Sequence, residues 1–342
     1  MKNIFFSLSF LLAAASAFSQ TSADSASQFF SKGVEEKNAR RYMVAYQQFQ
    51  KAIERQPNQF EYQKEAAITA LELRKYDQAR MHFEKAYQLN NSDDAVLSQL
   101  AQVNFSLRRW AQAIQYAEQM KQKNLKGYNY ILGRSHYEQE NYGESYKYLQ
   151  AASKEDPANA EIPYLIGRSF VDMNNYKMAV QFFEQAISKD STKANWIYET
   201  GLTYFAIPDA RRAIQYFELA IAKGYKTSND VMENLSNAYI EAGQPQKGIE
   251  MMKTLLEKKP ADMNLLWSLA EAYYKTAKYT EAIEYWDRML YYDKANAKPL
   301  YMIGLSYQKK GEKEKGQQLC DKAIEMDPSL KNLKQKKEMP AF

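Results

Sequence analysis

GRSHYEQENYGESYKYLQAA (Gly133–Ala152) and AEAYYKTAKYTEAIEYWDRM (Ala270–Met289) are two stretches that align from their first residues. Both begin with a small residue, and Tyr142 of the first lies opposite Tyr279 of the second. His136, which is one of only two histidines in the chain, lies opposite a tyrosine. The two stretches therefore read as copies of one unit, and His136 reads as a residue in an aromatic position.

A period of 34 residues extends this similarity over most of the chain. Counted in repeats from Ala26, with the third repeat two residues short and the sixth one residue long, position eight is small in all nine repeats. Its residues are Gly33, Ala67, Ala101, Gly133, Gly167, Gly201, Ser236, Ala270 and Gly304. Position twenty is equally small, with Ala45, Ala79, Ala113, Ser145, Ala179, Ala213, Gly248, Ala282 and Gly316. Self-similarity at a fixed period predicts a repeat architecture.

The pattern resembles the tetratricopeptide repeat (TPR) family, whose motif is clearest in Ile166–Phe170 (IGRSF), Tyr176, Ala179 and Phe183. The resemblance implies an all-α fold, a right-handed superhelical solenoid of antiparallel helix pairs. Proline closes several repeats, where its ring stops a helix. The predicted repeats are 26–59, 60–93, 94–125, 126–159, 160–193, 194–228, 229–262, 263–296 and 297–330.

Two further positions explain how the helices of one repeat would pack. Position twenty-four is large and mostly apolar, and position twenty-seven is alanine, methionine or leucine. Small residues at positions eight and twenty allow two helices to approach closely, and spacings of three and four residues put the apolar positions on one face. A single repeat cannot bury this face, so stacking on neighbouring repeats is expected to stabilise the array.

The chain ends are expected to differ from the repeats. Residues 1–19 resemble a signal peptide, with Lys2 before the apolar run Ile4–Ala15 and cleavage expected after Ala17 or Ser19. We therefore expect an exported protein, periplasmic or secreted, soluble and not a lipoprotein, with no transmembrane segment in the mature chain. Residues 20–25 form a short N-terminal segment, and residues 331–342 a basic end that is either a cap helix or a tail.

The resemblance also implies a concave binding surface, lined by positions two, five, nine, twelve and thirteen of the first helix of each repeat. The candidate peptide-binding residues at these positions are Tyr130, Arg134, Tyr137, Tyr164, Arg168, Tyr198, Phe205, Trp267, Tyr274 and Tyr301, with Asn237 and Glu271 beside them. Aromatic rings and arginine suit extended peptides. Alternatively, the arginines pair with the acids four residues on, Arg134 with Glu138 and Arg168 with Asp172.

No catalytic, cofactor-binding or metal-binding residues are predicted. Two separated histidines and one cysteine do not supply the convergent ligands of a zinc site. His136 is interpreted as a hydrogen-bonded core residue, and Cys320 as a small hydrophobic residue at position twenty-four. A net charge of +5 is too small an excess to indicate nucleic-acid binding.

The sequence thus favours a non-enzymatic scaffold that binds a protein or peptide partner in a cell-envelope assembly. Two alternatives remain open. Rows of tyrosine and tryptophan also stack on sugar rings, which would suit a carbohydrate-binding module for envelope polysaccharide. A helical solenoid of this kind could also regulate a separate enzyme.

Overall fold

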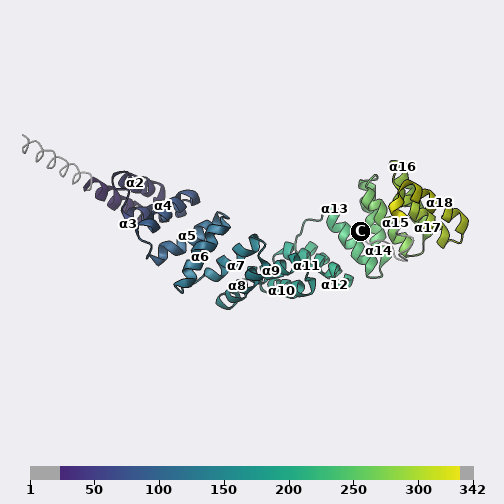
Figure 1. Cartoon of the computed structure of the whole chain (residues 1–342), viewed down its shortest axis with the longest axis horizontal. Helices are drawn as coiled ribbons and strands as arrows, with labels where there is room; N and C mark the ends of the chain where they lie inside the picture. The colour runs from purple at the N-terminus through teal and green to yellow at the C-terminus, as the bar shows by residue number, and fades with distance from the viewer. Residues whose placement is uncertain (1–23, 332–342) are drawn as a thin grey trace, which may run out of the picture. The chain divides into compact units, whose positions relative to one another are not determined.

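The computed structural model describes residues 24–331, which consist of helices joined by short turns (Figure 1). No strand occurs within this range, so the predicted all-α class is confirmed. The predicted signal peptide, residues 1–19, and residues 332–342 of the basic C-terminal end lie outside the described residues.

The chain divides into two compact units, Met1–Met173 and Asn174–Phe342. The N-terminal unit contains a helical segment over residues 24–38, followed by α2 (Tyr42–Arg55), α3 (Phe60–Glu72), α4 (Tyr76–Leu89), α5 (Asp94–Ser106), α6 (Trp110–Gln122), α7 (Tyr128–Glu138), α8 (Tyr142–Glu155) and α9 (Glu161–Asp172). The C-terminal unit contains α10 (Tyr176–Lys189), α11 (Ala194–Ala206), α12 (Ala210–Ala222), α13 (Asn229–Glu241), α14 (Pro245–Lys258), α15 (Met263–Lys275), α16 (Tyr279–Tyr292), α17 (Ala297–Lys309), α18 (Lys313–Met326) and the 3-10 turn η1 (Pro328–Leu330).

Within each unit the helices pack in sequential pairs. In the N-terminal unit α3 packs on α4, α5 on α6 and α7 on α8, and the second helix of a pair also contacts the first helix of the next. In the C-terminal unit the pairs are α11 with α12, α13 with α14, α15 with α16 and α17 with α18. From α3 onward, the first helix of each repeat begins at its predicted boundary or within two residues of it. Contacts therefore run between neighbours, as in a solenoid.

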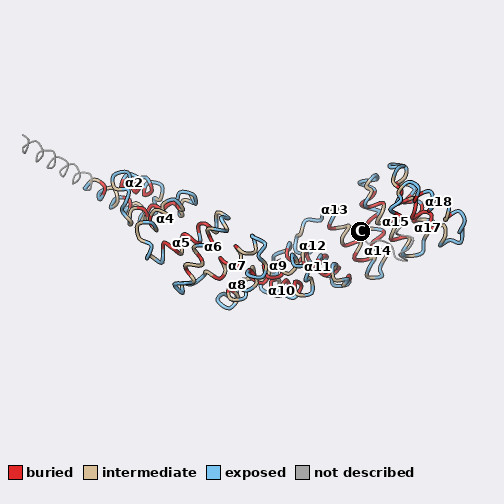
Figure 2. The backbone as a smooth tube through the Cα atoms, viewed as in Figure 1, coloured by how far each residue is buried: buried red, intermediate tan, exposed pale blue. Residues whose placement is uncertain are grey.

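The buried residues lie on the facing sides of the paired helices (Figure 2). All eighteen residues at positions eight and twenty are buried. The side chains at position twenty-four are buried too, with at most 2% of their surface exposed in any repeat. They are Phe49, Phe83, Ala117, Leu149, Phe183, Phe217, Met252, Trp286 and Cys320. The apolar stripe inferred from the repeat is therefore the core of each unit.

The glycines at position eight show why this position must be small. A Cβ atom on Gly201 would lie 2.7 Å from Cδ1 of Phe217, and one on Gly304 would lie 2.6 Å from Sγ of Cys320. The Gly304 Cβ would also lie 2.7 Å from the backbone oxygen of Gly316, at position twenty. All three distances are well inside van der Waals contact, and a backbone atom cannot turn away as a side chain can. The close approach of the two helices therefore depends on the missing side chain.

Replacing Gly304 with alanine should destabilise the C-terminal unit by about 1–3 kcal/mol, because the added methyl group overpacks the contact between α17 and α18. Gly143→Ala is the matched control, since a Cβ at this exposed position in α8 meets nothing within 4 Å. The control should be neutral or slightly stabilising, because alanine favours a helix over glycine. Thermal unfolding followed by circular dichroism measures both changes. Equal stability of the two variants would show that the contact at Gly304 is not tight.

Candidate functional site

The ten predicted peptide-binding residues all lie on the first helix of a repeat, but they divide between the two compact units. Tyr130, Arg134 and Tyr137 lie on α7, and Tyr164 and Arg168 lie on α9. In the C-terminal unit, α11 carries Tyr198 and Phe205, α15 carries Trp267 and Tyr274, and α17 carries Tyr301. Two of the ten, Tyr198 and Tyr301, are only 8% and 4% exposed, whereas the other eight are partly exposed.

On the N-terminal unit, Tyr130 and Arg134 share one acidic partner. The Tyr130 hydroxyl donates a hydrogen bond of 2.7 Å to Oε2 of Glu161, which is the first residue of α9. The Arg134 guanidinium pairs with Oε1 of the same carboxylate, and its second nitrogen lies 3.6 Å from Glu138. The predicted pairing of Arg134 with Glu138 is therefore present, and a stronger contact to Glu161 joins α7 to α9.

Tyr137 makes a similar bridge one turn further along α7. Its hydroxyl donates a hydrogen bond of 3.0 Å to Oδ2 of Asp172, at the end of α9. Its ring lies 5.9 Å from the ring of Tyr142, at the start of α8. Arg168 lies close enough to act electrostatically on both phenols. The first helices of two successive repeats are thus connected by side chains at the predicted surface positions.

These tyrosines act as hydrogen-bond donors over the whole physiological pH range. Burial is the largest cause and the hydrogen bond to Glu161 the second, and they raise the pKa of Tyr130 to about 12. Burial also raises the pKa of Tyr137. A phenol with a raised pKa stays protonated at neutral pH, so each hydroxyl can donate to its carboxylate.

An aromatic row continues from this surface onto α5 and α6. The Phe105 ring lies 5.7 Å from the Trp110 ring and 5.9 Å from the Tyr130 ring. Phe105 occupies position twelve of the third repeat, so the rule that selected the other candidates would have found it had it been applied one repeat earlier. The same rule applies to Glu161 and Asp172, at positions two and thirteen of the fifth repeat. We refer to Phe105, Trp110, Tyr130, Arg134, Tyr137, Glu161, Arg168 and Asp172 as the α7–α9 face.

In the C-terminal unit, the two buried candidates belong to the packing between helices. The Tyr198 hydroxyl accepts a hydrogen bond of 2.7 Å from Nδ2 of Asn234, and its ring stacks on Tyr225 at 4.5 Å. Tyr301 lies in the same hydrophobic core as Trp286 and Cys320. These contacts leave little of the surface of either tyrosine side chain accessible to a partner.

Trp267 and Tyr274 join an aromatic cluster built from α15 and α16. The Tyr274 ring lies 5.7 Å from the Trp286 ring and 5.4 Å from the Tyr279 ring. The Trp267 ring lies 6.1 Å from the Trp286 ring. The fully buried Trp286 therefore fixes both candidates in place.

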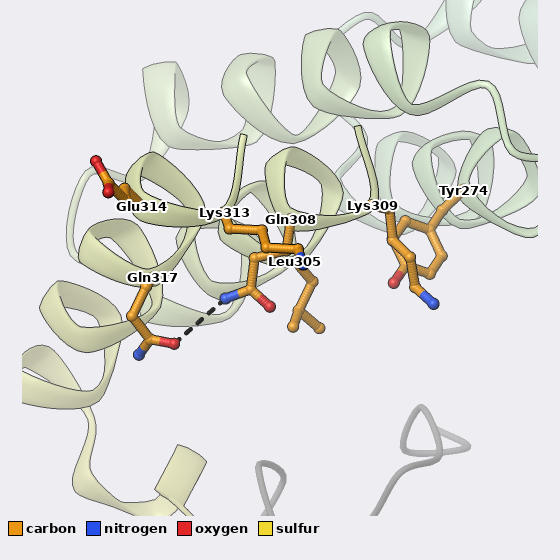
Figure 3. A pocket seen from close by; sticks show the side chains of 7 residues that line it. All are labelled: Tyr274, Leu305, Gln308, Lys309, Lys313, Glu314 and Gln317. Carbon is orange, nitrogen blue, oxygen red and sulfur yellow. Dashed lines mark hydrogen bonds between the residues drawn. The ribbon is translucent and has the colours of Figure 1, made fainter. Parts of the chain in front are cut away.

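Tyr274 also lines a hollow of about 550 Å³ formed by α15, α17 and α18 (Figure 3). Nε2 of Gln308 donates to Oε1 of Gln317 across this hollow, at 3.5 Å. Of its lining residues, only Tyr274 was predicted from the sequence. The full lining, which we call the α15–α18 hollow, is Tyr274, Leu305, Gln308, Lys309, Lys313, Glu314 and Gln317. Leu305, Gln308 and Lys309 occupy positions nine, twelve and thirteen of the last repeat. The rule that selected the other candidate binding residues by repeat position would therefore have selected these three as well.

His136 is held by stacking and not by the hydrogen bond that the sequence led us to expect. Its ring stacks on Tyr148, with centroids 5.7 Å apart and planes 6° from parallel. Its Nδ1 atom is buried and has no hydrogen-bond partner, so the prediction of a hydrogen-bonded core histidine is wrong in this respect. At the same position of later repeats, Tyr204 stacks on Tyr216 in the same way. From the fourth repeat onward this position holds a flat ring, which explains why the histidine fits without a polar partner.

The other histidine, His82, has the polar partners that His136 lacks. Its Nε2 lies 3.1 Å from the Tyr46 hydroxyl, and its Nδ1 lies 2.7 Å from Oε1 of Gln63. Burial lowers the pKa of both histidines below the ordinary value of 6.5.

Comparison with known families agrees with the helix pairs. Models of the tetratricopeptide repeat family match residues 30–94, 64–124, 130–193 and 234–299, and a further model of the same family matches residues 297–330. These matches cover well over half of the chain, and the protein belongs to the tetratricopeptide repeat family.

The chain is also similar to solved structures. One is YrrB, described as a TPR protein with an unusual peptide-binding site; it is 22% identical, and the match covers 53% of this chain and 92% of that one, with a TM-score of 0.42. Another is MamA AMB-1, which is 21% identical over 49% of this chain and 98% of that one, with a TM-score of 0.40. No curated protein shows significant similarity to the chain.

The pKa values of the two histidines give a test of their surroundings. Because burial lowers both values, the unfolded chain binds more protons than the folded chain below about pH 6.5, and stability should fall as the pH drops through this region. Two-dimensional NMR should show both imidazoles titrating below 6.5. His136→Tyr should remove one signal, keep the fold and reduce the acid-induced loss of stability. An imidazole that titrates above 6.5 would contradict the described packing of that residue.

Proposed function

We propose that the protein is an exported, non-enzymatic scaffold that binds protein or peptide partners through the first helices of its repeats. The observation that carries this proposal is the α7–α9 face. Its aromatic and polar side chains are partly exposed, and contacts between successive helices hold them in place.

Fixed positions matter because a partner then binds to side chains that are already ordered. Tyr130 and Arg134 are both held by Glu161, and Tyr137 is held by Asp172. Binding therefore costs less side-chain entropy than it would on a surface of freely rotating residues. Tyrosine, tryptophan and arginine are also the residues that most often dominate the energy of protein interfaces.

The charges of this face indicate what kind of partner it suits. Two carboxylates, those of Glu138 and Glu161, pair with the Arg134 guanidinium, and Arg168 and Asp172 both lie close enough to Tyr137 to act electrostatically on its phenol. Arg134 is thus compensated within the protein, and the face presents aromatic surface with charges of both signs. A partner with exposed aromatic or apolar side chains fits this surface better than a strongly acidic one.

Export is the second part of the proposal, and its support comes from the sequence. Lys2 and the apolar run Ile4–Ala15 have the order of a signal peptide. Within residues 24–331, none of the helices is both long and apolar enough to cross a bilayer.

One experiment tests both parts. The full-length chain with a C-terminal tag is expressed in its native cells, cross-linked, and purified from the cell envelope. The purified protein should have lost its first 17 or 19 residues by intact mass. Reproducible partners should be cross-linked to α7 and α9, and Arg134→Ala with Arg168→Ala should reduce their recovery several-fold. The double variant should lose little stability, because both arginines are partly exposed and surface ion pairs contribute about 0–1 kcal/mol each.

The matched control is Lys177→Ala with Arg211→Ala, which removes the same charge from exposed positions on α10 and α12. It should recover partners as the wild type does. A protein that keeps Met1 would reject export. Partners recovered equally with the arginine variant and the control would remove the α7–α9 face from the binding surface.

A further inference from the structure

We propose that the α15–α18 hollow is a second binding site, specific for an extended acidic peptide segment that carries a large apolar side chain. The inference rests on the proposed function only in taking a peptide as the ligand. It adds a separate site, on the C-terminal unit, and the chemistry of the partner that this site selects.

The apolar part of the hollow is formed by Tyr274 and Leu305. Both side chains are partly exposed, and they come from neighbouring first helices, α15 and α17. The Tyr274 ring is fixed by its contacts with Tyr279 and Trp286. The hollow therefore offers a preformed apolar surface, which is the usual basis of a binding pocket.

The cationic part is formed by Lys309 and Lys313, which are exposed and make no ion pair with any residue in the range 24–331. The nearby lysines Lys310 and Lys315 do make ion pairs, since the Nζ atom of each lies 3.8 Å from a carboxylate oxygen of Glu312. Among the described residues, these two ammonium groups thus remain at the hollow without a carboxylate in ion-pair contact.

Glu314 is the one acidic residue in the lining, and it does not cancel these charges at the centre of the site. Figure 3 shows its carboxylate turned away from the space between Gln308 and Tyr274, whereas Lys309 lies beside the Tyr274 ring. A ligand in that space would meet positive charge next to apolar surface.

Two amide side chains give the hollow its peptide-like hydrogen-bonding groups. Gln308 and Gln317 bond each other at 3.5 Å, which is a long hydrogen bond. The Gln317 amide nitrogen also donates a hydrogen bond of 2.7 Å to Oδ1 of Asp321. The Gln317 oxygen and the Gln308 amide can exchange their weak contact for bonds to the backbone of an extended chain.

The same position in the three preceding repeats shows how the last repeat differs from them. Gln317 occupies position twenty-one, where Ile214, Ile249 and Ile283 are each less than 9% exposed. Gln317 is partly exposed and borders the hollow. The last helix pair thus replaces a buried apolar residue with a polar one, on the side of α18 that faces the hollow.

Charge decides between the possible occupants. The chain's own C-terminal end, residues 331–342, contains four lysines and one glutamate, so it carries the same sign as Lys309 and Lys313. Like charges brought together in the hollow would repel each other, whereas carboxylates of a partner would be attracted. We therefore assign the hollow to an acidic partner and not to the protein's own basic end.

The test uses the full mature protein and a phage-displayed library of random peptides. Enriched peptides are synthesised with a fluorescein label, and their binding is measured by fluorescence anisotropy. A class of peptides should combine Asp or Glu with Leu, Phe or Tyr, and should bind more weakly as salt is added. Lys309→Gln with Lys313→Gln should weaken this class by at least about threefold, which corresponds to losing two exposed charge contacts.

Two control variants isolate the site. Lys294→Gln with Lys322→Gln makes the same charge change at exposed positions outside the hollow, and it should bind these peptides as the wild type does. Arg134→Ala with Arg168→Ala should also leave this class unaffected, because its residues lie in the other unit.

The outcomes separate this inference from the proposed function. Peptides that bind but respond equally to the hollow variant and the lysine control would overturn the inference alone. A library that yields no binding peptide, together with no cross-linked partner in cells, would reject the proposed function as well. Self-association in sedimentation that the hollow variant abolishes would make a second copy the occupant and would also overturn the inference.

Discussion

The contact between a missing side chain on one helix and a large side chain on its partner is the constraint on which the rest of this structure depends. Gly133 faces Leu149, and Gly201 faces Phe217, with no room for a Cβ atom between them. This contact lets the two helices of a repeat approach closely and bury the apolar stripe. Because a small residue recurs at this position in every repeat, successive repeats within each unit stack in the same way, and their first helices lie beside one another. The surface that carries the α7–α9 face exists for this reason.

The part of the fold that could be predicted from the sequence is the part set by this steric rule. Small residues such as Gly304 and Gly316 recur at a fixed period, so their spacing predicts both the repeat and the start of each first helix. The pairing of Tyr130 and Arg134 with Glu161 could not be predicted, because it depends on how far α9 is displaced along α7. Sequence spacing within one helix suggested Glu138 as the partner of Arg134, and the contact across helices adds to that pairing.

The candidate sites show a similar division. Position in the repeat identified the residues on the first helices, including Tyr137 and Tyr274, but it could not separate exposed from buried members. Tyr198 and Tyr301 are buried because neighbouring helices cover them, which is a property of the packing and not of the repeat position. The α15–α18 hollow was missed because the rule was not applied to Leu305, Gln308 and Lys309 of the last repeat, and because the residues of α18 lie outside the first helices that it considers. The two surfaces also differ in charge: Arg134 of the α7–α9 face pairs with two carboxylates, whereas Lys309 and Lys313 of the hollow pair with none in residues 24–331.

A double-mutant cycle at Gly133 and Leu149 tests the central claim most directly. Gly133→Ala adds a methyl group where Leu149 already lies 2.7 Å from the new Cβ atom, and Leu149→Ala removes that side chain from a fully buried site. The double variant recreates the combination of Ala101 and Ala117 that α5 and α6 already accommodate with both residues fully buried. We expect the double variant to lose about 0.5–3 kcal/mol less free energy of unfolding than the two single losses added together, because the second change removes the clash caused by the first. Chemical denaturation measures all three losses. Losses that add within about 0.3–0.5 kcal/mol would contradict the claim that these two positions determine the approach of the helices.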